Sequence, residues 1–166
     1  MKFSDQFHTD IAIIQREPVH GLEIEELSVD NMDPIFRLNE TIFGEERVIN
    51  TFDRPDLLLL LATLDDEPIG FKVGYRENRF VFYSAKGGVL TDVRRRGIAI
   101  ALMDAMMEKA GAMGYSRFAF DTFPNLHPGM TVLGIRDGFR LMKADYNTTY
   151  REYRLRFEKR IERATG

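Results

Sequence analysis

The sequence predicts one α/β domain built on a mixed sheet, with elements in the order β-α-β-β-β-α-β-α-β-β. Its 166 residues are enough to bury one core, and no linker or internal repeat divides them. Short apolar blocks and alternating apolar residues predict the strands, and apolar residues at helical spacing predict the helices. We therefore expect residues 1–166 to form a single domain.

The first strand and helix are predicted at residues 21–43. Residues 21–29 carry apolar side chains among acidic ones, which is typical of a strand with one buried face. Asp30 is a suitable N-cap for the helix that follows, and Gly44 is a suitable end. A short additional helix is expected in the irregular segment 45–55. One side of the first helix carries Met32, Ile35, Phe36, Asn39, Ile42 and Phe43.

Three strands are predicted in quick succession. Residues 57–64 form a continuous apolar run of buried-strand length, and residues 69–75 alternate apolar with small or polar side chains. The third strand, residues 79–90, is rich in aromatic residues and is interrupted by Gly87 and Gly88. Paired glycines within a strand indicate a bulge or a place where another group approaches the backbone closely.

The second half of the chain supplies the remaining elements. Residues 98–113 predict a long helix ending near Gly114, and a strand follows at 118–122. Residues 128–137 predict a short helix before the terminal antiparallel pair, 139–146 and 150–159. We expect inward side chains at Tyr153, Leu155 and Phe157, and solvent or a partner beside Met103 and Met107.

Composition excludes several classes of protein. Hydrophobic residues make up 44% and charged residues 30%, which argues against disorder, and the net charge of -3 implies no general attraction to nucleic acid or to an acidic membrane. The chain has no cysteine, so a disulfide, a thiolate metal site and a cysteine nucleophile are all excluded. The three histidines show no metal-ligand spacing, so no metal is expected.

The N-terminal sequence predicts a cytoplasmic protein. MKFSDQFHTD is polar and lacks the apolar core of a signal peptide. The longest apolar run, 57–62, is far shorter than the ~20 residues of a membrane helix.

The stretch TDVRRRGIA, residues 91–99, carries the chemistry. The start of a helix presents unpaired backbone N–H groups and a partial positive charge, which together bind anions. Gly97 permits a tight turn and Ala99 keeps the next turn small, so that a ligand can reach the amides. Arg94, Arg95 and Arg96 add charges that match phosphate oxygens. A solvated turn is the alternative, and the phosphate-binding and dinucleotide-binding glycine motifs are absent.

Arg94 to Ala99 match R-x-x-G-x-A, which resembles the acetyl-CoA-binding motif [QR]-x-x-G-x-[GA] of the GNAT superfamily of N-acetyltransferases. The segment from about Leu22 to Phe157 follows the order of elements in that family. Small bacterial members are more similar still, sharing a set of short motifs. In this sequence they are Gly70-Phe71-Lys72, Phe82-Tyr83-Ser84, Gly87-Gly88-Val89, and the run of Asn125, Met130, Leu133, Ile135 and Gly138-Phe139.

The resemblance implies a mixed, largely antiparallel sheet with a splayed middle strand, flanked by about four helices. It also implies a ternary complex in which a primary amine attacks acetyl-CoA directly. Gly88, Val89 and Leu90 would then lie beside the pantetheine arm, and a backbone amide there would polarise the thioester carbonyl. Asn125 would contact the arm as well. The pyrophosphate would be bound at Arg94 and at the amides of Arg95, Arg96, Gly97, Ile98, Ala99 and Ile100.

The residues that move protons do not follow from the family pattern. An amine with a lysine-like pKa of ~10.4 must lose a proton before it attacks, and the leaving thiolate takes one up. Many family members place a tyrosine on the helix before the final Gly-Phe turn, where this chain has Gly134. Tyr83, Glu45 and Glu46 are the candidates by expected position.

The acceptor, a small molecule, an amino acid or a peptide amine, is left open. A second hypothesis is a catalytically degenerate acyl-CoA-binding sensor or partner-binding domain, motivated by Gly134. A third is a nucleic-acid-binding domain that uses the arginines and the basic C-terminal segment, against which the net charge of -3 counts. Edge strands make a homodimer possible.

Overall fold

The computed structural model of the protein describes residues 16–94 and 97–164. The described chain forms two compact units. The larger unit holds residues 17–120 together with the end of the chain from residue 160, and the smaller unit holds Arg16 and residues 121–159.

The larger unit is built on a mixed, mostly antiparallel sheet. Its strands follow the order β1-β2-β3-β4-β5, with antiparallel pairing from β1 to β4 and parallel pairing between β4 and β5. Only the first four residues of β5 belong to this unit. The strands are β1 (Leu22–Leu27), β2 (Leu58–Leu64), β3 (Glu67–Arg76), β4 (Val81–Val89) and β5 (Arg117–Thr122).

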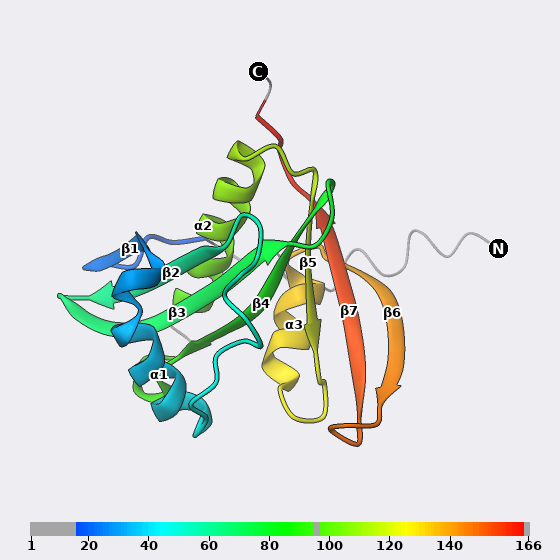
Figure 1. Ribbon diagram of the computed structural model, residues 1–166, viewed down its shortest axis with the longest axis horizontal. Coiled ribbons are helices and arrows are strands. Elements are labelled where there is room, and N and C mark those ends of the chain that lie inside the picture. Colours follow the sequence, from blue (N-terminus) through cyan, green and yellow to red (C-terminus); the bar gives the residue numbers. More distant parts are fainter. Residues whose placement is uncertain (1–15, 95–96, 165–166) are drawn as a thin grey trace. The chain divides into compact units, whose positions relative to one another are not determined.

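Two helices cover opposite faces of β1–β4 (Figure 1). The first, α1 (Asp33–Phe43), packs on the face of Gly88, where an added Cβ would meet the Phe43 ring at 3.0 Å. The second, α2 (Ile98–Ala112), packs on the face of Gly70, where an added Cβ would meet Leu102 at 3.4 Å. The glycines therefore let both helices approach the sheet closely.

The core between α1 and the sheet consists of aliphatic and aromatic side chains from two strands, from the helix and from the segments on either side of the helix. Strand β2 is apolar throughout its buried part because it lies between two neighbouring strands and two helical layers. The buried residues of this cluster are Met32, Ile35, Leu38, Val48, Leu59, Leu61, Phe71 and Val73.

The smaller unit contains α3 (Pro128–Arg136) and an antiparallel hairpin of β6 (Arg140–Asn147) and β7 (Glu152–Arg160), whose last residue belongs to the larger unit. Residues of β6 are mostly exposed. Arg16, which also belongs to this unit, forms an ion pair within it. The Arg16 guanidinium donates to the Asp137 carboxylate. Lys159 also donates to the Asp137 carbonyl oxygen at 2.7 Å.

The predicted fold class, element order and splayed strand are confirmed. Pairing between β4 and β5 covers only Val81–Ser84 of the described chain, so the two strands part after Ser84. The expected number of helices is wrong, since the described residues contain three α-helices rather than about four. The segment 45–55 forms no helix, and its start is tied to α1 where the Asn39 amide donates to the Glu45 carbonyl at 2.7 Å.

Four side-chain predictions also need correction. Asp30 is not a helix N-cap, because it lies in a 3-10 turn and α1 begins at Asp33 with Pro34 in its first turn. Met103 and Met107 are buried instead of facing solvent or a partner. Tyr153 is 58% exposed and packs edge-on against Tyr146, so it does not point inward.

No helix in the described ranges is long and apolar enough to cross a bilayer.

We expect Gly74→Ala to destabilise the protein by about 1–3 kcal/mol. An added Cβ would lie 2.7 Å from the Phe82 ring and 2.8 Å from both the Met106 sulfur and the Tyr83 carbonyl oxygen. The carbonyl belongs to the neighbouring strand and cannot move away without disturbing the sheet. Urea unfolding measures the loss. Gly129→Ala is the control, since nothing lies within 4 Å of its Cβ, and its stability should be unchanged or slightly higher.

Candidate functional site

The N-terminus of α2 has the features of an anion site. Gly97, the residue before the helix, has a φ of 83°, a left-handed conformation that favours glycine. No described side chain caps the helix, and its first turn carries no acidic residue. The backbone amides of Ile98, Ala99 and Ile100 are therefore available to an anionic ligand. Arg95 and Arg96 lie outside the described residues.

Strand β4 has an open edge immediately before this helix. Val73 pairs with Lys86 and Gly74 with Ser84, so Ala85 is the extra residue of a β-bulge. The bulge lies where pairing with β5 ends. From Ala85 to Val89, β3 is the only described strand that pairs with β4.

The register determines which backbone groups face the open side. The Leu90 amide donates to the Ile69 carbonyl at 2.9 Å, so Leu90 and alternate residues before it face β3. Gly87 and Val89 consequently direct their N–H and C=O groups away from β3. Arg94 satisfies one of these, since its Nε donates to the Val89 carbonyl at 3.2 Å. An extended polar ligand could pair with the others.

The glycine pair serves both faces of the sheet. An added Cβ at Gly88 would meet Phe43 and Ile42 of α1 at 3.0–3.1 Å. At Gly87, on the α2 face, it would meet Lys72 Cγ at 3.3 Å and Lys72 Nζ at 3.5 Å. Side chains of α1 and β3 thus lie against Gly88 and Gly87, the two positions where β4 has no side chain of its own.

A cation and a carboxylate lie together on the α1 face of β4. Lys86 Nζ is 2.8 Å from Glu45 Oε2, 3.3 Å from the Arg47 carbonyl oxygen and 4.6 Å from the centre of the Phe43 ring. The Glu45 carboxylate is largely exposed, whereas Lys86 is mostly buried. The structure therefore brings Glu45 to the bulged part of β4 through a lysine that the sequence did not single out.

The other two catalytic candidates have different surroundings. Tyr83 is half-buried and its ring packs edge-on against Tyr75, with centroids 5.7 Å apart. It shares the α1 face with Lys86 because the bulge at Ala85 keeps both side chains on that side. Glu46 is exposed, and no described residue pairs with its carboxylate.

Lys72 is the buried cation of the α2 face. Its side chain is 6% exposed, and no described carboxylate forms an ion pair with it. Burial lowers the Lys72 pKa from 10.5 to about 8, because the ammonium loses its hydration. The sequence placed Lys72 in the motif Gly70-Phe71-Lys72 but gave it no role in the site, although a lysine within the buried strand GFKVGY was an available signal.

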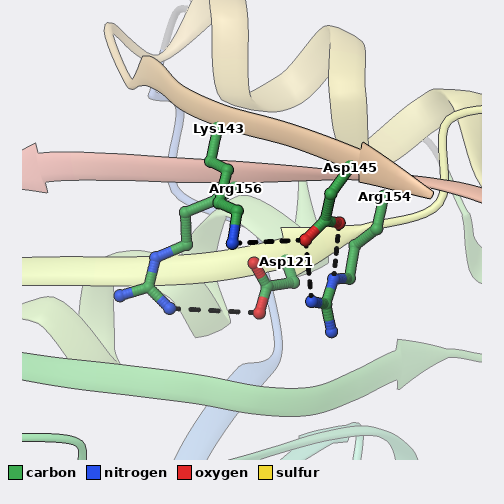
Figure 2. A pocket seen from close by; sticks show the side chains of 5 residues that line it. All are labelled: Asp121, Lys143, Asp145, Arg154 and Arg156. Atoms are coloured by element: carbon green, nitrogen blue, oxygen red, sulfur yellow. Dashed lines mark hydrogen bonds and ion pairs between the residues drawn. The ribbon is translucent and has the colours of Figure 1, made fainter. Parts of the chain in front are cut away.

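A separate charged pocket occurs in the smaller unit (Figure 2). It measures about 120 Å³ and is lined by Asp121, Lys143, Asp145, Arg154 and Arg156. The hydrogen bond from Arg154, together with Lys143, holds the Asp145 pKa below its usual value. Its acidic and basic groups are paired with one another, and the pocket contains none of the predicted site residues.

Asn125 lies in the smaller unit, apart in sequence from the rest of the predicted cofactor site. Its amide donates to Glu152 Oε2 at 3.0 Å. The described residues among the other predicted ones, Gly88, Val89, Leu90, Arg94 and Gly97 to Ile100, instead lie in the larger unit, at the open edge of β4, after it and at the start of α2. Within the described ranges, no cluster of three or more histidine, aspartate or glutamate side chains could hold a metal ion.

Comparison with protein families identifies the domain. The model of the Acetyltransferase (GNAT) family matches residues 22–131, which include the open edge of β4 and the start of α2. The chain belongs to the GNAT acetyltransferase family. No curated protein matches it.

Solved GNAT structures share the fold at low sequence identity. The ribosomal-protein-S18-alanine N-acetyltransferase from Escherichia coli is 16% identical with a TM-score of 0.70, covering 87% of this chain and 96% of its own. A GNAT family acetyltransferase from Elizabethkingia anophelis with acetyl-CoA bound is 17% identical with a TM-score of 0.73, covering 86% and 99%. An IAA acetyltransferase from Bacillus cereus is 18% identical with a TM-score of 0.72, covering 84% and 99%.

We expect Lys72→Met to stabilise this GNAT domain by on the order of 3 kcal/mol at about pH 7. The lowered pKa means that folding disfavours the ammonium. That penalty is fully present below pH 8 and is relieved as the pH rises from about 8 towards 10.5. The stability difference between variant and wild type should therefore shrink over this range.

Urea unfolding at about pH 7 and about pH 10 measures this difference. Lys109→Met is the control, because Lys109 is partly exposed and its contact with Glu26 spans 3.4 Å, so its loss should change stability by less than about 1 kcal/mol. A Lys72→Met protein less stable than wild type at neutral pH would contradict the expected cost of burial.

Proposed function

We propose that the protein transfers the acetyl group of acetyl-CoA to a primary amine in a ternary complex, and that the whole chain acts as one N-acetyltransferase domain. The observation that carries the proposal is the succession of two backbone sites in the larger unit. The uncapped start of α2 at Ile98 follows the open edge of β4 in the chain, after the 3-10 turn Thr91–Val93. A ligand with an anionic group joined to an extended amide-containing arm fits both.

The residues present suit acetyl-CoA. The pyrophosphate would lie at Arg94 and the amides from Arg95 to Ile100, where the helix dipole favours negative charge. The pantetheine arm would lie along Leu90, Val89 and Gly88, and it would pair with the backbone groups of Val89 and Gly87, which face away from β3. Asn125 remains a further candidate for contact with the arm.

We assign the removal of the proton from the incoming amine to residues on the α1 face of β4. Glu45 accepts a hydrogen bond from Lys86 at 2.8 Å, which holds its carboxylate beside the strand. We propose Glu45 as the group that accepts the proton of the incoming amine, directly or through water. Tyr83 shares this face and is proposed to help orient the amine. Glu46 is exposed, and no described residue pairs with its carboxylate.

The acceptor is proposed to be a small molecule, an amino acid or a peptide amine. The name of the Escherichia coli structure, an N-acetyltransferase of a ribosomal-protein alanine, supports including a peptide terminus. Release of CoA thiol from acetyl-CoA across a panel of such amines tests the proposal. Binding of acetyl-CoA without thiol release from any amine would favour a sensor instead.

We expect Gly97→Val to weaken acetyl-CoA binding at least about tenfold. The φ of 83° is strained for a β-branched residue, so the amides at the start of α2 would be displaced. Titration calorimetry measures the affinity. Gly114→Val is a matched control, because it imposes the same kind of strain at a φ of 102° beyond the other end of α2. Equal loss of affinity in both variants would argue against a ligand at Gly97.

We expect Glu45→Gln to lower kcat about 100-fold, since general base catalysis contributes about 10²–10⁴. Glu46→Gln makes the same chemical change at the adjacent residue and should lower kcat less than about threefold. Steady-state thiol release with the best amine of the panel measures both. If Glu46→Gln is the more damaging variant, the assignment of the base to Glu45 is wrong.

A further inference from the structure

The Lys72 ammonium occupies an unusual place for a charge. It extends from the middle of β3 across Gly87 of the neighbouring strand, with Nζ 3.5 Å from the position that a Cβ of Gly87 would take. The side chain is almost fully buried. Lysine is rarely buried in this way unless it is paired.

The surroundings of Lys72 within the larger unit are apolar. Leu60 is its partner on β2, and Gly87 is its partner on β4. On the same face, α2 contacts the sheet at Gly70 through Leu102 and at Gly74 through Met106, on either side of Lys72. The helix also carries Asp104, Glu108 and Lys109, but burial alone accounts for the perturbation of Lys72. The ammonium therefore has no described anion to compensate its burial.

The position of Lys72 along β4 indicates what could supply that compensation. The proposed path of the pantetheine arm starts at the helix and passes Leu90, Val89 and Gly88. Gly87 is the next residue, about 10 Å along the strand from Leu90 at roughly 3.3 Å per residue. The reactive end of an extended arm would thus arrive where the ammonium lies, beside the bulge at Ala85.

We propose that Lys72 binds the sulfur end of acyl-CoA, donating a hydrogen bond to the sulfur and a proton to the departing thiolate. This inference rests on the proposed function and adds the proton donor that Gly134 does not supply. Tyr83 is less suited to this role because it lies on the opposite, α1 face of β4. Lys72 approaches from the α2 face, leaving the α1 face to the amine.

The transfer step balances with this assignment. The neutral amine nitrogen bonds to the thioester carbonyl carbon, the carbon–sulfur bond breaks, and its electron pair goes to sulfur. Lys72 delivers a proton to sulfur, which yields the CoA thiol and a neutral lysine. The extra proton on the new amide nitrogen leaves through Glu45 or water, and Lys72 regains a proton from solvent. The products are the N-acyl amine and CoA.

The test compares two ligands that differ only at the sulfur. CoA and desulfo-CoA are titrated against the full-length wild type and Lys72→Met. A charge-assisted hydrogen bond to sulfur should give wild type about a tenfold preference for CoA. In Lys72→Met the preference should fall to about one, with desulfo-CoA affinity changing less than about threefold. Lys109→Met, which removes a lysine from the exposed side of α2, should keep the wild-type preference.

Each outcome decides a different point. If both proteins bind CoA with the same preference over desulfo-CoA, Lys72 does not contact the sulfur and the inference is overturned, while the proposed function stands. If Lys72→Met weakens both ligands equally, its role is structural, which also overturns the inference. If wild type binds neither ligand, the proposed function is wrong, and the inference that rests on it is wrong as well.

Discussion

The candidate site depends on the point in β4 at which the strand stops pairing with one of its two neighbouring strands. Up to Ser84 this strand is paired on both sides, and beyond the bulge at Ala85 its described partner is β3 alone. Backbone N–H and C=O groups that face away from β3 must then be satisfied by another partner. Arg94 supplies one at the Val89 carbonyl. The rest form a polar edge along β4, which is where the extended ligand is proposed to bind.

The two faces of β4 carry different charged groups. Phe43 and Ile42 of α1 lie against Gly88, Lys72 of β3 lies against Gly87, and Lys86 of β4 itself lies on the α1 face. Lys86, on the α1 face, is compensated by Glu45, Arg47 and the Phe43 ring. Lys72, on the α2 face, is not compensated by any described residue. A buried charge retained at a cost in stability is typical of a functional position, where local rules of packing are broken for another purpose.

The sequence predicted the elements well where the signal was local. Alternation in residues 69–75 and the apolar run at 57–64 correspond to β3 and β2, and Gly44 ends α1 in a left-handed conformation as expected. Predictions failed where contacts between residues far apart in the sequence decide which side chains are buried. Met103 and Met107 are buried, although solvent or a partner is expected beside them from the sequence, because α2 is apolar around most of its circumference and spacing alone cannot indicate its exposed side. Tyr153 pairs with Tyr146 across an exposed hairpin rather than facing inward.

By itself, the sequence determined the family, the order of the elements and the location of the helix start after Gly97 that is proposed to bind an anion. These depend on contiguous patterns, above all the arginine–glycine turn before an apolar helix. Only the tertiary structure decided which side chains meet at β4. The burial of Lys72 depends on the register of β2, β3 and β4 together with α2, and the pairing of Lys86 with Glu45 joins residues 41 positions apart. Such contacts depend on strand register and bulge position, because one extra residue moves every following side chain to the opposite face.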